Sequence, residues 1–267
     1  MDDFAGERVS LRRRIVRYGA DGVRDEEDEI AVEYALTIRL DGDDFATMVC
    51  TPADLEELVV GFLASEGVIR LPSDIKSLAV DEAAGFARVE LVNPNAAGKS
   101  TVSKRFIGSC CGKSRQFYFH NDARTAKTST SAVTLTPRQC RSLMAELQAS
   151  SGGFRATGGV HNAALCTPEA VVVARADIGR HNALDKIYGY CLQRRVPTKD
   201  AIVAFSGRIS SEVLLKVAKI GAGVVLSKSA PTTLALDLAD DLGITAVGFI
   251  RGESMNVYTH THRIIEA

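Results

Sequence analysis

Alternating apolar and polar positions predict that the first half of the chain is rich in strands. In residues 28–42 the apolar residues fall at every second position, the period of a strand with one buried face. They are Ile30, Val32, Tyr34, Leu36, Ile38 and Leu40. The polar run 41–44 then predicts a hairpin to a second strand at 45–50. A further strand pair is expected near 75–80 and 86–92.

A helix is expected between these two strand pairs. Thr51, Pro52 and Asp54 resemble a helix start, with a hydroxyl cap, proline at the first helical position and an acid in the first turn. The helix should run from about Pro52 to Ser65. Together these elements predict a small α+β unit.

The second half has another rhythm, in which apolar runs alternate with amphipathic stretches. The expected strands are 170–174, 201–205, 223–227 and 245–250, and the expected helices are 181–193, 210–221 and 231–243. This alternation is typical of a three-layer α/β/α domain. A capping signature, Thr136 followed by Gln139, begins another helix with an apolar face. Residues 157–164 are interpreted as one more helix start, with His161 near its N-terminus.

Residues 93–132 lose the periodic pattern and are rich in Gly, Ser, Lys, Thr and Asn. We interpret them as the connection between two domains. The first domain, residues 1–127, is expected to end in a flexible cysteine-containing loop at about 98–127. The α/β/α domain is expected to span residues 128–267.

Small, hydroxylic and cationic residues follow each expected strand of the second half. These residues include Asp177, Arg180 and His181; Ser206 and Arg208; Ser227 and Lys228; and the run 249–254. Sheets of this kind bind ligands beyond the carboxyl ends of their strands, and backbone N–H groups, hydroxyls and fixed cations bind phosphate. The sequence therefore predicts a site for a polyanion with several phosphates. The alternative is that these residues only form turns and caps.

Composition and charge narrow the class of protein. The chain has 267 residues, 46% of them hydrophobic, and a formal net charge of -1. This composition excludes global disorder, and the near-neutral charge argues against generic nucleic-acid binding. Apolar runs fall short of the roughly 20 residues that a membrane span needs, and no leader pattern opens the sequence. We therefore expect a cytosolic protein with no membrane or nucleic-acid partner.

Two adjacent cysteines, Cys110 and Cys111, form the sharpest local feature. Lysines and arginines flank them, and nearby cations lower the pKa of a thiol and so raise its nucleophilic thiolate fraction. The alternative is a buried structural pair. The spacing of the glycines before Lys113 is too short for a nucleotide-binding P-loop, and adjacent cysteines lack the usual zinc spacing. The remaining four cysteines fall inside predicted elements and are expected in the core.

His161 invites comparison with zinc nucleobase deaminases, which carry His-x-Glu at a helix start and Pro-Cys-x-x-Cys later. Here Ala163 occupies the Glu position, and no Pro-Cys-x-x-Cys occurs. Deamination is therefore not expected. His161 and His181 are candidates for binding a ligand or moving protons, with a structural hydrogen-bonding role as the alternative.

Six segments, in order, resemble the FdhD/NarQ family of formate dehydrogenase accessory sulfurtransferases. They are SCCGKSR, TGGVHNAAL, DIGRHNALDKIYG, SGRISSEVLLKVAKIG, SKSAPTTLALDLADDLG and VGFIRGESMNVYTH. The resemblance extends from about Asp28 to the C-terminus. It implies a cytosolic homodimer with a C-terminal domain of cytidine-deaminase-like fold and a smaller β-rich N-terminal domain.

The resemblance also implies a reaction. A cysteine desulfurase loads sulfur on a loop cysteine as a persulfide, and the sulfur then passes to the molybdenum of bis(molybdopterin guanine dinucleotide), the cofactor that formate dehydrogenase receives. No permanent metal is expected beyond this cargo. Many family members have Cys-x-x-Cys in the loop, whereas Cys110 and Cys111 are adjacent, so which of the two holds the persulfide stays open. A non-catalytic cofactor chaperone is the alternative function, and a zinc deaminase a more distant one.

By the same resemblance, one run of residues matches the family's cofactor-binding segment. This run is Phe249, Ile250, Arg251, Gly252, Glu253 and Ser254. Arg180, Arg208, Lys228 and Arg251 are our candidates for phosphate contacts, with Asp177 and His181 shaping the site. His161, Ser206 and Ser227 complete the predicted binding residues.

Overall fold

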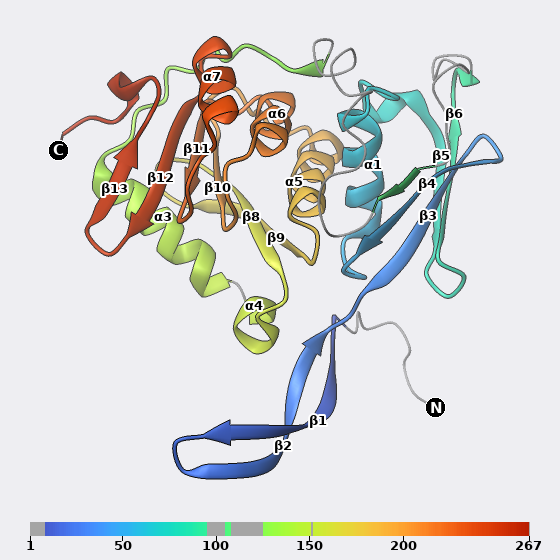
Figure 1. Ribbon diagram of the computed structural model, residues 1–267. Helices are drawn as coiled ribbons and strands as arrows, with labels where there is room; N and C mark the ends of the chain where they lie inside the picture. The colour runs from blue at the N-terminus through green and yellow to red at the C-terminus, as the bar shows by residue number, and fades with distance from the viewer. Residues whose placement is uncertain (1–8, 95–104, 108–124, 151, 267) are drawn as a thin grey trace.

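The computed structural model describes residues 9–94, 105–107, 125–150 and 152–266 (Figure 1). Cys110, Cys111 and most of the expected loop at 98–127 lie outside these residues. The described chain forms three sheets: a two-stranded ribbon, a five-stranded sheet and a six-stranded sheet. The first two come from the N-terminal half of the chain and the third from the C-terminal half.

The ribbon consists of β1 (Ser10–Gly19) and β2 (Gly22–Ala31), and it extends away from the rest of the molecule (Figure 1). The alternation of residues 30–40 predicts one continuous strand, and this prediction is wrong. The chain leaves β2 at Ala31 and enters β3 at Tyr34, passing from the ribbon into another sheet. Alternation reports which side chains face one way, and it does not reveal that the pairing partner changes.

The five-stranded sheet has the order β5-β6-β3-β4-β7. Its strands are β3 (Tyr34–Leu40), β4 (Asp43–Cys50), β5 (Ile75–Asp81), β6 (Phe86–Leu91) and β7 (Arg105–Ile107). The predicted hairpin is confirmed, with Asp41 and Gly42 at φ 51° and 93° in its two-residue turn. The second strand pair is confirmed as well.

Helix α1 (Leu55–Ser65) covers this sheet, and a short 3-10 turn, η1 (Pro72–Asp74), follows it. The expected start at Pro52 is wrong, because the helix begins three residues later and Asp54 occupies the N-cap without a side-chain cap bond. The Thr51 hydroxyl accepts a hydrogen bond from Ile178 N instead. The Thr51 hydroxyl, which the local pattern predicts to cap the helix, therefore binds a residue far away in the sequence.

The six-stranded sheet has the order β13-β12-β11-β10-β8-β9. Its strands are β8 (His161–Cys166), β9 (Val171–Asp177), β10 (Ile202–Phe205), β11 (Val224–Ser227), β12 (Thr245–Arg251) and β13 (Ser254–Val257). The four strands predicted for this half are confirmed as β9 to β12. A further 3-10 turn, η3 (Thr261–Arg263), lies near the C-terminus.

Helices pack on both faces of the six-stranded sheet. One face packs against α3 (Pro137–Ser150), whose predicted capping box between Thr136 and Gln139 is present. The other face packs against α5 (Arg180–Arg194), α6 (Ser211–Ile220) and α7 (Thr233–Asp241). The predicted α/β alternation is therefore confirmed as helix, sheet and helix layers.

The helix predicted to start at residue 157 is wrong. A short helix, α4 (Gly152–Thr157), ends there, Gly158 follows at φ 64°, and His161 begins strand β8. In β8 the residues from Asn162 to Cys166 are all buried, with β9 on one side and β10 on the other. An apolar run that is buried on both faces has no period that separates strand from helix.

One apolar core joins the two larger sheets. It runs from the five-stranded sheet through α1 and α5 to the inner face of the six-stranded sheet. The two helices touch at glycines, since a Cβ on Gly61 would lie 1.8 Å from Asp185 O and one on Gly189 would lie 1.9 Å from Glu57 O. The expected domain boundary at residue 127 stays a prediction.

Candidate functional site

Strand directions bring the predicted site residues to one edge of the six-stranded sheet. β10 pairs in parallel with β11, and β11 with β12, while β8 is antiparallel to both β9 and β10. The carboxyl ends of β9 to β12 and the start of β8 therefore share an edge. His161 pairs directly with Asp177 there. Because β8 runs opposite to its neighbours, its first residue, His161, lies at the same edge as the carboxyl ends of β9 to β12.

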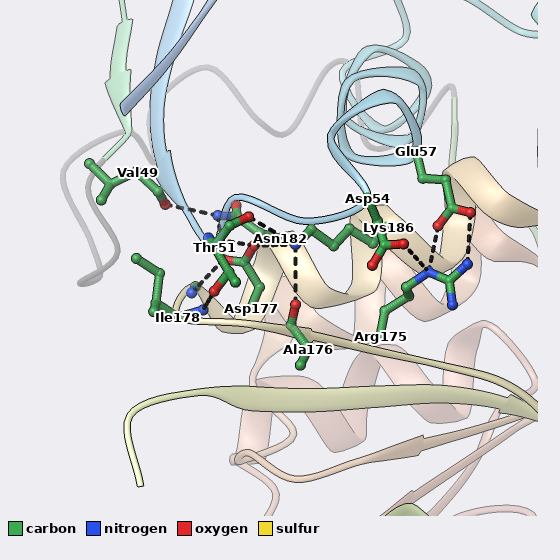
Figure 2. A network of polar contacts seen from close by, with 11 residues as sticks. Val49, Thr51, Asp54, Glu57, Arg175, Ala176, Asp177, Ile178, Asn182 and Lys186 are labelled. Atoms are coloured by element: carbon green, nitrogen blue, oxygen red, sulfur yellow. Dashed lines mark hydrogen bonds and ion pairs between the residues drawn. The ribbon is translucent and has the colours of Figure 1, made fainter. Parts of the chain in front are cut away.

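At the end of β9, Asp177 lies in a buried polar network (Figure 2). Its carboxylate is 2.8 Å from Lys186 Nζ, and it accepts hydrogen bonds from the backbone N–H groups of Thr51 and Gly179 and from Asn182 Nδ2. Asp177 and Lys186 are both 0% exposed. Asp177 therefore stabilises the backbone at this edge and is not itself accessible to a ligand.

The same network fastens the end of β4 to the end of β9. Lys186 Nζ donates to the carbonyls of Thr51 and Ala176, and Asn182 Nδ2 donates to the carbonyl of Val49 (Figure 2). Each donor comes from α5 and each acceptor from a strand end. We call Thr51, Asp177, Asn182 and Lys186 the seam network, because they join the two larger sheets.

A second polar contact lies farther along the same junction. Arg175 on β9 makes a two-pronged ion pair with Glu57 on α1, with Nε and Nη2 at 2.6 and 2.8 Å from the two carboxylate oxygens (Figure 2). Asp54 Oδ1 lies 3.3 Å from Arg175 Nε. The Arg175 guanidinium also lies 5.2 Å from the centroid of the Tyr190 ring. Bidentate pairing of this kind fixes orientation as well as distance.

The first turn of α5 places Arg180 and His181 beside His161. Arg180 Nε is buried and makes no hydrogen bond with any of the described residues. His181 Nε2 lies 3.2 Å from Glu212 Oε2 on α6, although not in hydrogen-bond geometry. A buried guanidinium nitrogen at the start of a helix, with no partner from the described chain, is a group that an anion would satisfy.

Burial lowers the pKa of His161, and the nearby Arg180 and His181 lower it further, while Asp177 acts in the opposite direction. His161 is therefore neutral near pH 7, since the unperturbed pKa of a histidine is about 6.5. A neutral imidazole at this edge serves as a hydrogen-bonding group, and the positive charge comes from arginine and lysine side chains.

Ser206 and Ser227, both predicted to bind ligand, are occupied by contacts between neighbouring loops. The Ser206 hydroxyl accepts from Asn162 N, and the buried Ser227 hydroxyl donates to Gly207 O and accepts from Ser229 N. These bonds hold the loops after β10 and β11 against each other. The hydroxyls of Ser206 and Ser227 therefore stabilise the sheet edge from which the cationic side chains extend.

Arg208, Lys228 and Arg251 extend from this edge toward solvent. Arg208 and Arg251 are exposed and Lys228 is half-buried. Arg251 Nε donates to Lys228 O at 3.0 Å, which joins the loop after β11 to the end of β12. None of the three forms an ion pair with a described residue, so their charges are available to an anion.

The segment 249–254 forms the bend from β12 into β13. Phe249 has φ 51°, in the left-handed region that a bulky residue seldom adopts, and its ring is partly exposed next to the Arg251 guanidinium. Strained backbone of this kind clusters at functional sites. Ile250 is buried in the core, Glu253 pairs with Arg141 at 3.2 Å, and Ser254 Oγ donates to Arg251 O. Gly252 has φ 53° and leaves the bend open.

The four cysteines in the described chain are buried, as predicted. Burial raises the pKa of Cys50, Cys166 and Cys191 to about 12 and that of Cys140 to about 11. These thiols are protonated and enclosed at pH 7 and are poor nucleophiles. Within the described ranges, no cluster of three or more His, Cys, Asp or Glu residues could hold a metal ion.

Sequence reasoning did not identify Thr51 and Lys186 as parts of this edge, and it placed Asn182 in the run after β9 without giving it a role. Thr51 resembled a helix cap, and Lys186 resembled an ordinary polar residue of an amphipathic helix. One signal was available, because Asn182 and Lys186 are four residues apart and so share a helix face, which also holds the buried Gly189. A polar pair on a buried face predicts a buried polar contact.

Comparison with known proteins adds a consistent set of relatives. The model of the FdhD/NarQ family matches residues 31–265. The chain is 61% identical to the sulfur carrier protein FdhD of Geobacillus kaustophilus, covering 96% of this chain and 98% of that one. It is 53% identical to the sulfur carrier protein FdhD of Bacillus subtilis, covering 97% and 99%.

A solved structure shares the fold. It is the crystal structure of a candidate formate dehydrogenase accessory protein from Desulfotalea psychrophila, with a TM-score of 0.78 and 26% identity, covering 96% of this chain and all of that one. No helix in the described parts of the chain is both long and apolar enough to span a membrane.

Proposed function

Because this chain belongs to the FdhD/NarQ family, we propose that it is a sulfur carrier in the maturation of formate dehydrogenase. In this proposal Cys110 or Cys111 accepts sulfur from a cysteine desulfurase as a persulfide. The sulfur then passes to the molybdenum of bis(molybdopterin guanine dinucleotide), the substrate held at the carboxyl edge of the six-stranded sheet. The proposal includes a cytoplasmic location, a homodimer and a C-terminal domain of cytidine-deaminase-like fold.

The observation that carries the proposal is the gathering at one edge of cations that form no ion pair with any described residue. Arg180, Arg208, Lys228 and Arg251 come from four different strand ends, and the hydroxyls of Ser206 and Ser227 hold the loops between them. Charge-assisted bonds to phosphate oxygens are strong when the donors are fixed in advance. A guanine dinucleotide ligand supplies several such oxygens.

Phe249 adds a feature that simple phosphate binding does not need. Its ring is partly exposed beside Arg251, and stacking on an aromatic ring is a common way to bind a nucleobase. A base stacked on this ring would lie next to cations suited to the phosphates. The arrangement supports a nucleotide rather than an inorganic polyanion.

The nucleophile is assigned by elimination and by position in the chain. The four described cysteines are buried with raised pKa values, which leaves Cys110 and Cys111, themselves outside the described residues. The chain enters their segment after Ile107, which pairs with Met48 near the end of β4. The seam network fastens that same end of β4 to the end of β9. The segment therefore begins next to the proposed binding edge.

The loading step balances as a thiol exchange. A loop thiolate attacks the terminal sulfur of the desulfurase persulfide, a new sulfur–sulfur bond forms, and the desulfurase cysteine leaves as its thiolate. When the acceptor takes the terminal sulfur as a neutral atom, the loop cysteine returns as a thiolate, and the acceptor supplies the two electrons that reduce this sulfur to sulfide. Flanking lysine and arginine side chains favour the anionic sulfur species at both stages.

Mass spectrometry of the full chain tests the proposal. After incubation with a cysteine desulfurase and cysteine, the wild type should gain about 32 Da per sulfur atom on the peptide that contains Cys110 and Cys111. The double variant Cys110→Ala/Cys111→Ala should lose this gain, and the buried Cys140→Ser variant should keep it. The two single variants would show which cysteine is loaded.

Two outcomes would contradict the assignment. Full formate dehydrogenase activity supported by the double variant would exclude both cysteines as carriers. Binding of the guanine dinucleotide cofactor without any mass gain in the wild type would favour the non-catalytic chaperone instead.

A further inference from the structure

The β1–β2 ribbon has two open edges and little support from the rest of the molecule. Each residue of β1 pairs with one residue of β2, from Ser10 with Ala31 to Gly19 with Gly22, and neither strand pairs with a third strand of the described chain. Figure 1 shows the ribbon extending away from the two larger sheets. A lone two-stranded ribbon is at best marginally stable in water, which suggests that another surface covers it.

The most exposed apolar side chains of the ribbon lie on one of its faces. Side chains alternate along each strand, so Val16 and Tyr18 of β1 share a face with Val23 of β2. They are 54%, 80% and 59% exposed. We call this side the outer face, and its charged members are Arg12, Arg14, Asp25, Glu27 and Glu29. Exposed apolar side chains within a charged surround are typical of a docking surface.

The basic residues of the ribbon lie mainly on β1, and its acidic residues lie on β2. β1 has Arg12, Arg13, Arg14 and Arg17 and no acid, while residues 25–29 of β2 are all acidic. Several of these charges pair within the ribbon, as Arg17 does with Glu26 and Asp28. Arg14 and Glu27, opposite each other on the outer face, form no ion pair with any described residue. A surface with one basic and one acidic strand is complementary to a copy of itself.

Two-fold symmetry allows three ways to join two such ribbons. Edge-to-edge pairing places β1 against β1 or β2 against β2, so that like charges face each other. The two ribbons can also stack face to face. If the two-fold axis between them is perpendicular to the strands, β1 again lies over β1 and like charges meet. Only stacking about an axis along the strands places the basic strand of each copy over the acidic strand of the other.

Residue register then distinguishes the two faces of the ribbon. With the axis along the strands, each residue meets the copy of its own cross-strand partner. On the outer face this brings Arg14 to Glu27 and Tyr18 to Val23 of the second copy. On the opposite face Arg17 would meet Arg24. The outer face therefore brings no like charges together, whereas the opposite face does.

We infer that the outer face of the β1–β2 ribbon binds the same face of a second copy of this chain. Tyr18 and Val23 form the apolar end of the contact, and Arg14 pairs with the second copy's Glu27. The inference deepens the proposed function, since it gives a surface to the homodimer included there. It does not depend on which cysteine is loaded with sulfur.

Charge reversal and mixing of variants test this contact in the full chain. We expect the wild type to be a dimer in sedimentation velocity at micromolar concentration. Arg14→Glu and Glu27→Arg should each weaken the dimer by about tenfold or more, because two unlike pairs become like pairs. Arg13→Glu is the matched control, since Arg13 is the next residue along β1 but lies on the opposite face, and it should leave the dimer unchanged.

Mixing the two single variants separates the contact from folding of the ribbon. In a mixed dimer, one copy carries Arg14→Glu and the other carries Glu27→Arg. The introduced glutamate of the first copy then faces the introduced arginine of the second, and the native Arg14 and Glu27 face each other in the other pair. Both cross-copy pairs are unlike again, while the like-charged pair within each ribbon persists. An equimolar mixture should therefore recover dimer that neither variant forms alone.

Each other outcome overturns the inference. A monomeric wild type excludes the dimer, and single variants as dimeric as the wild type place the interface elsewhere. Loss of dimer without recovery on mixing means that the substitutions act on the ribbon itself. Equal loss in Arg13→Glu excludes the outer face. The persulfide mass gain is measured independently, so failure here differs from failure of the sulfur-carrier proposal.

Discussion

Two parts of one sheet edge use similar side chains in opposite ways. At the end of β9, the cation Lys186 is fully buried and neutralised by Asp177, and the hydrogen bonds around them join β4, β9 and α5. At the ends of β10 to β12, Arg208, Lys228 and Arg251 reach toward solvent without ion pairs to described residues. Position along the edge, rather than residue type, decides which charges hold the fold.

The difference shows how the proposed binding edge combines a rigid base with free cations. A buried charge is tolerated only when it is paired and hydrogen-bonded, and the seam network meets this condition. Cations meant for a ligand must lack internal partners. In the proposed function, the first part therefore determines stability, and the second part determines affinity for an anion.

Breaking the seam network should cause the largest loss in the free energy of unfolding. Lys186→Met removes the partner of a fully buried carboxylate, and the free energy of unfolding should fall by about 3–5 kcal/mol. Urea denaturation measures this change. Arg208→Met, which removes an exposed cation from the same edge, should alter it by no more than about 0.5 kcal/mol. Equal losses would remove the distinction between the two parts.

Substitution at the glycine contact between α1 and α5 should cause the next largest loss of stability. In Gly61→Ala the new Cβ would lie 1.8 Å from Asp185 O, so the helices must separate, at a cost of about 1–3 kcal/mol or more. Gly152→Ala, where a Cβ meets nothing within 4 Å, is the matched control. Thermal unfolding of both variants would test this, and a stable Gly61→Ala would argue against close packing at the seam.

The open part of the edge should respond in binding rather than stability. Arg208→Ala should weaken binding of GDP, used as a probe for the nucleotide end of the ligand, by about tenfold to a hundredfold, since bonds to charged groups contribute about 1.5–3 kcal/mol. Titration calorimetry measures the affinity. Arg194→Ala, at the opposite end of α5, should change nothing. A loss shared by both variants would contradict a local site.

The smallest expected effect concerns His161. Its pKa is lowered in the folded protein, so the unfolded chain binds more protons as the pH falls below about 6.5, and stability decreases there. His161→Gln should flatten the curve of unfolding free energy between pH 7 and pH 5. The exposed His262→Gln should leave the curve unchanged. The opposite slope would mean that a ligand-free His161 gains a proton on folding.

The layered second half was predictable because each of its elements has a clear pattern. The apolar strands β9 to β12 and the amphipathic helices between them differ in period, and one edge of strand ends follows from their parallel order. β8 was not predictable in the same way. Its run from Asn162 to Cys166 is buried on both faces, and only its neighbours β9 and β10 determine that it is a strand.

The N-terminal half shows two other limits of sequence reasoning. Charged residues dominate β1, so its alternation was hidden and the ribbon was not expected. Thr51 had the pattern of a helix cap, and its actual partners are Asp177 and Ile178, more than a hundred positions away. The roles of Cys110 and Cys111 stay predictions from sequence and family resemblance.

The shared apolar core has a consequence for how the molecule comes apart. Since α1 and α5 pack against each other between the two larger sheets, neither sheet can be exposed without baring the helix that covers the other. Heating should therefore melt both sheets in one cooperative event. A fragment cut near residue 127 would expose the face of α1 or α5 that the other half covers, so evolution and protein engineering alike must keep the two halves in a single polypeptide or supply them together.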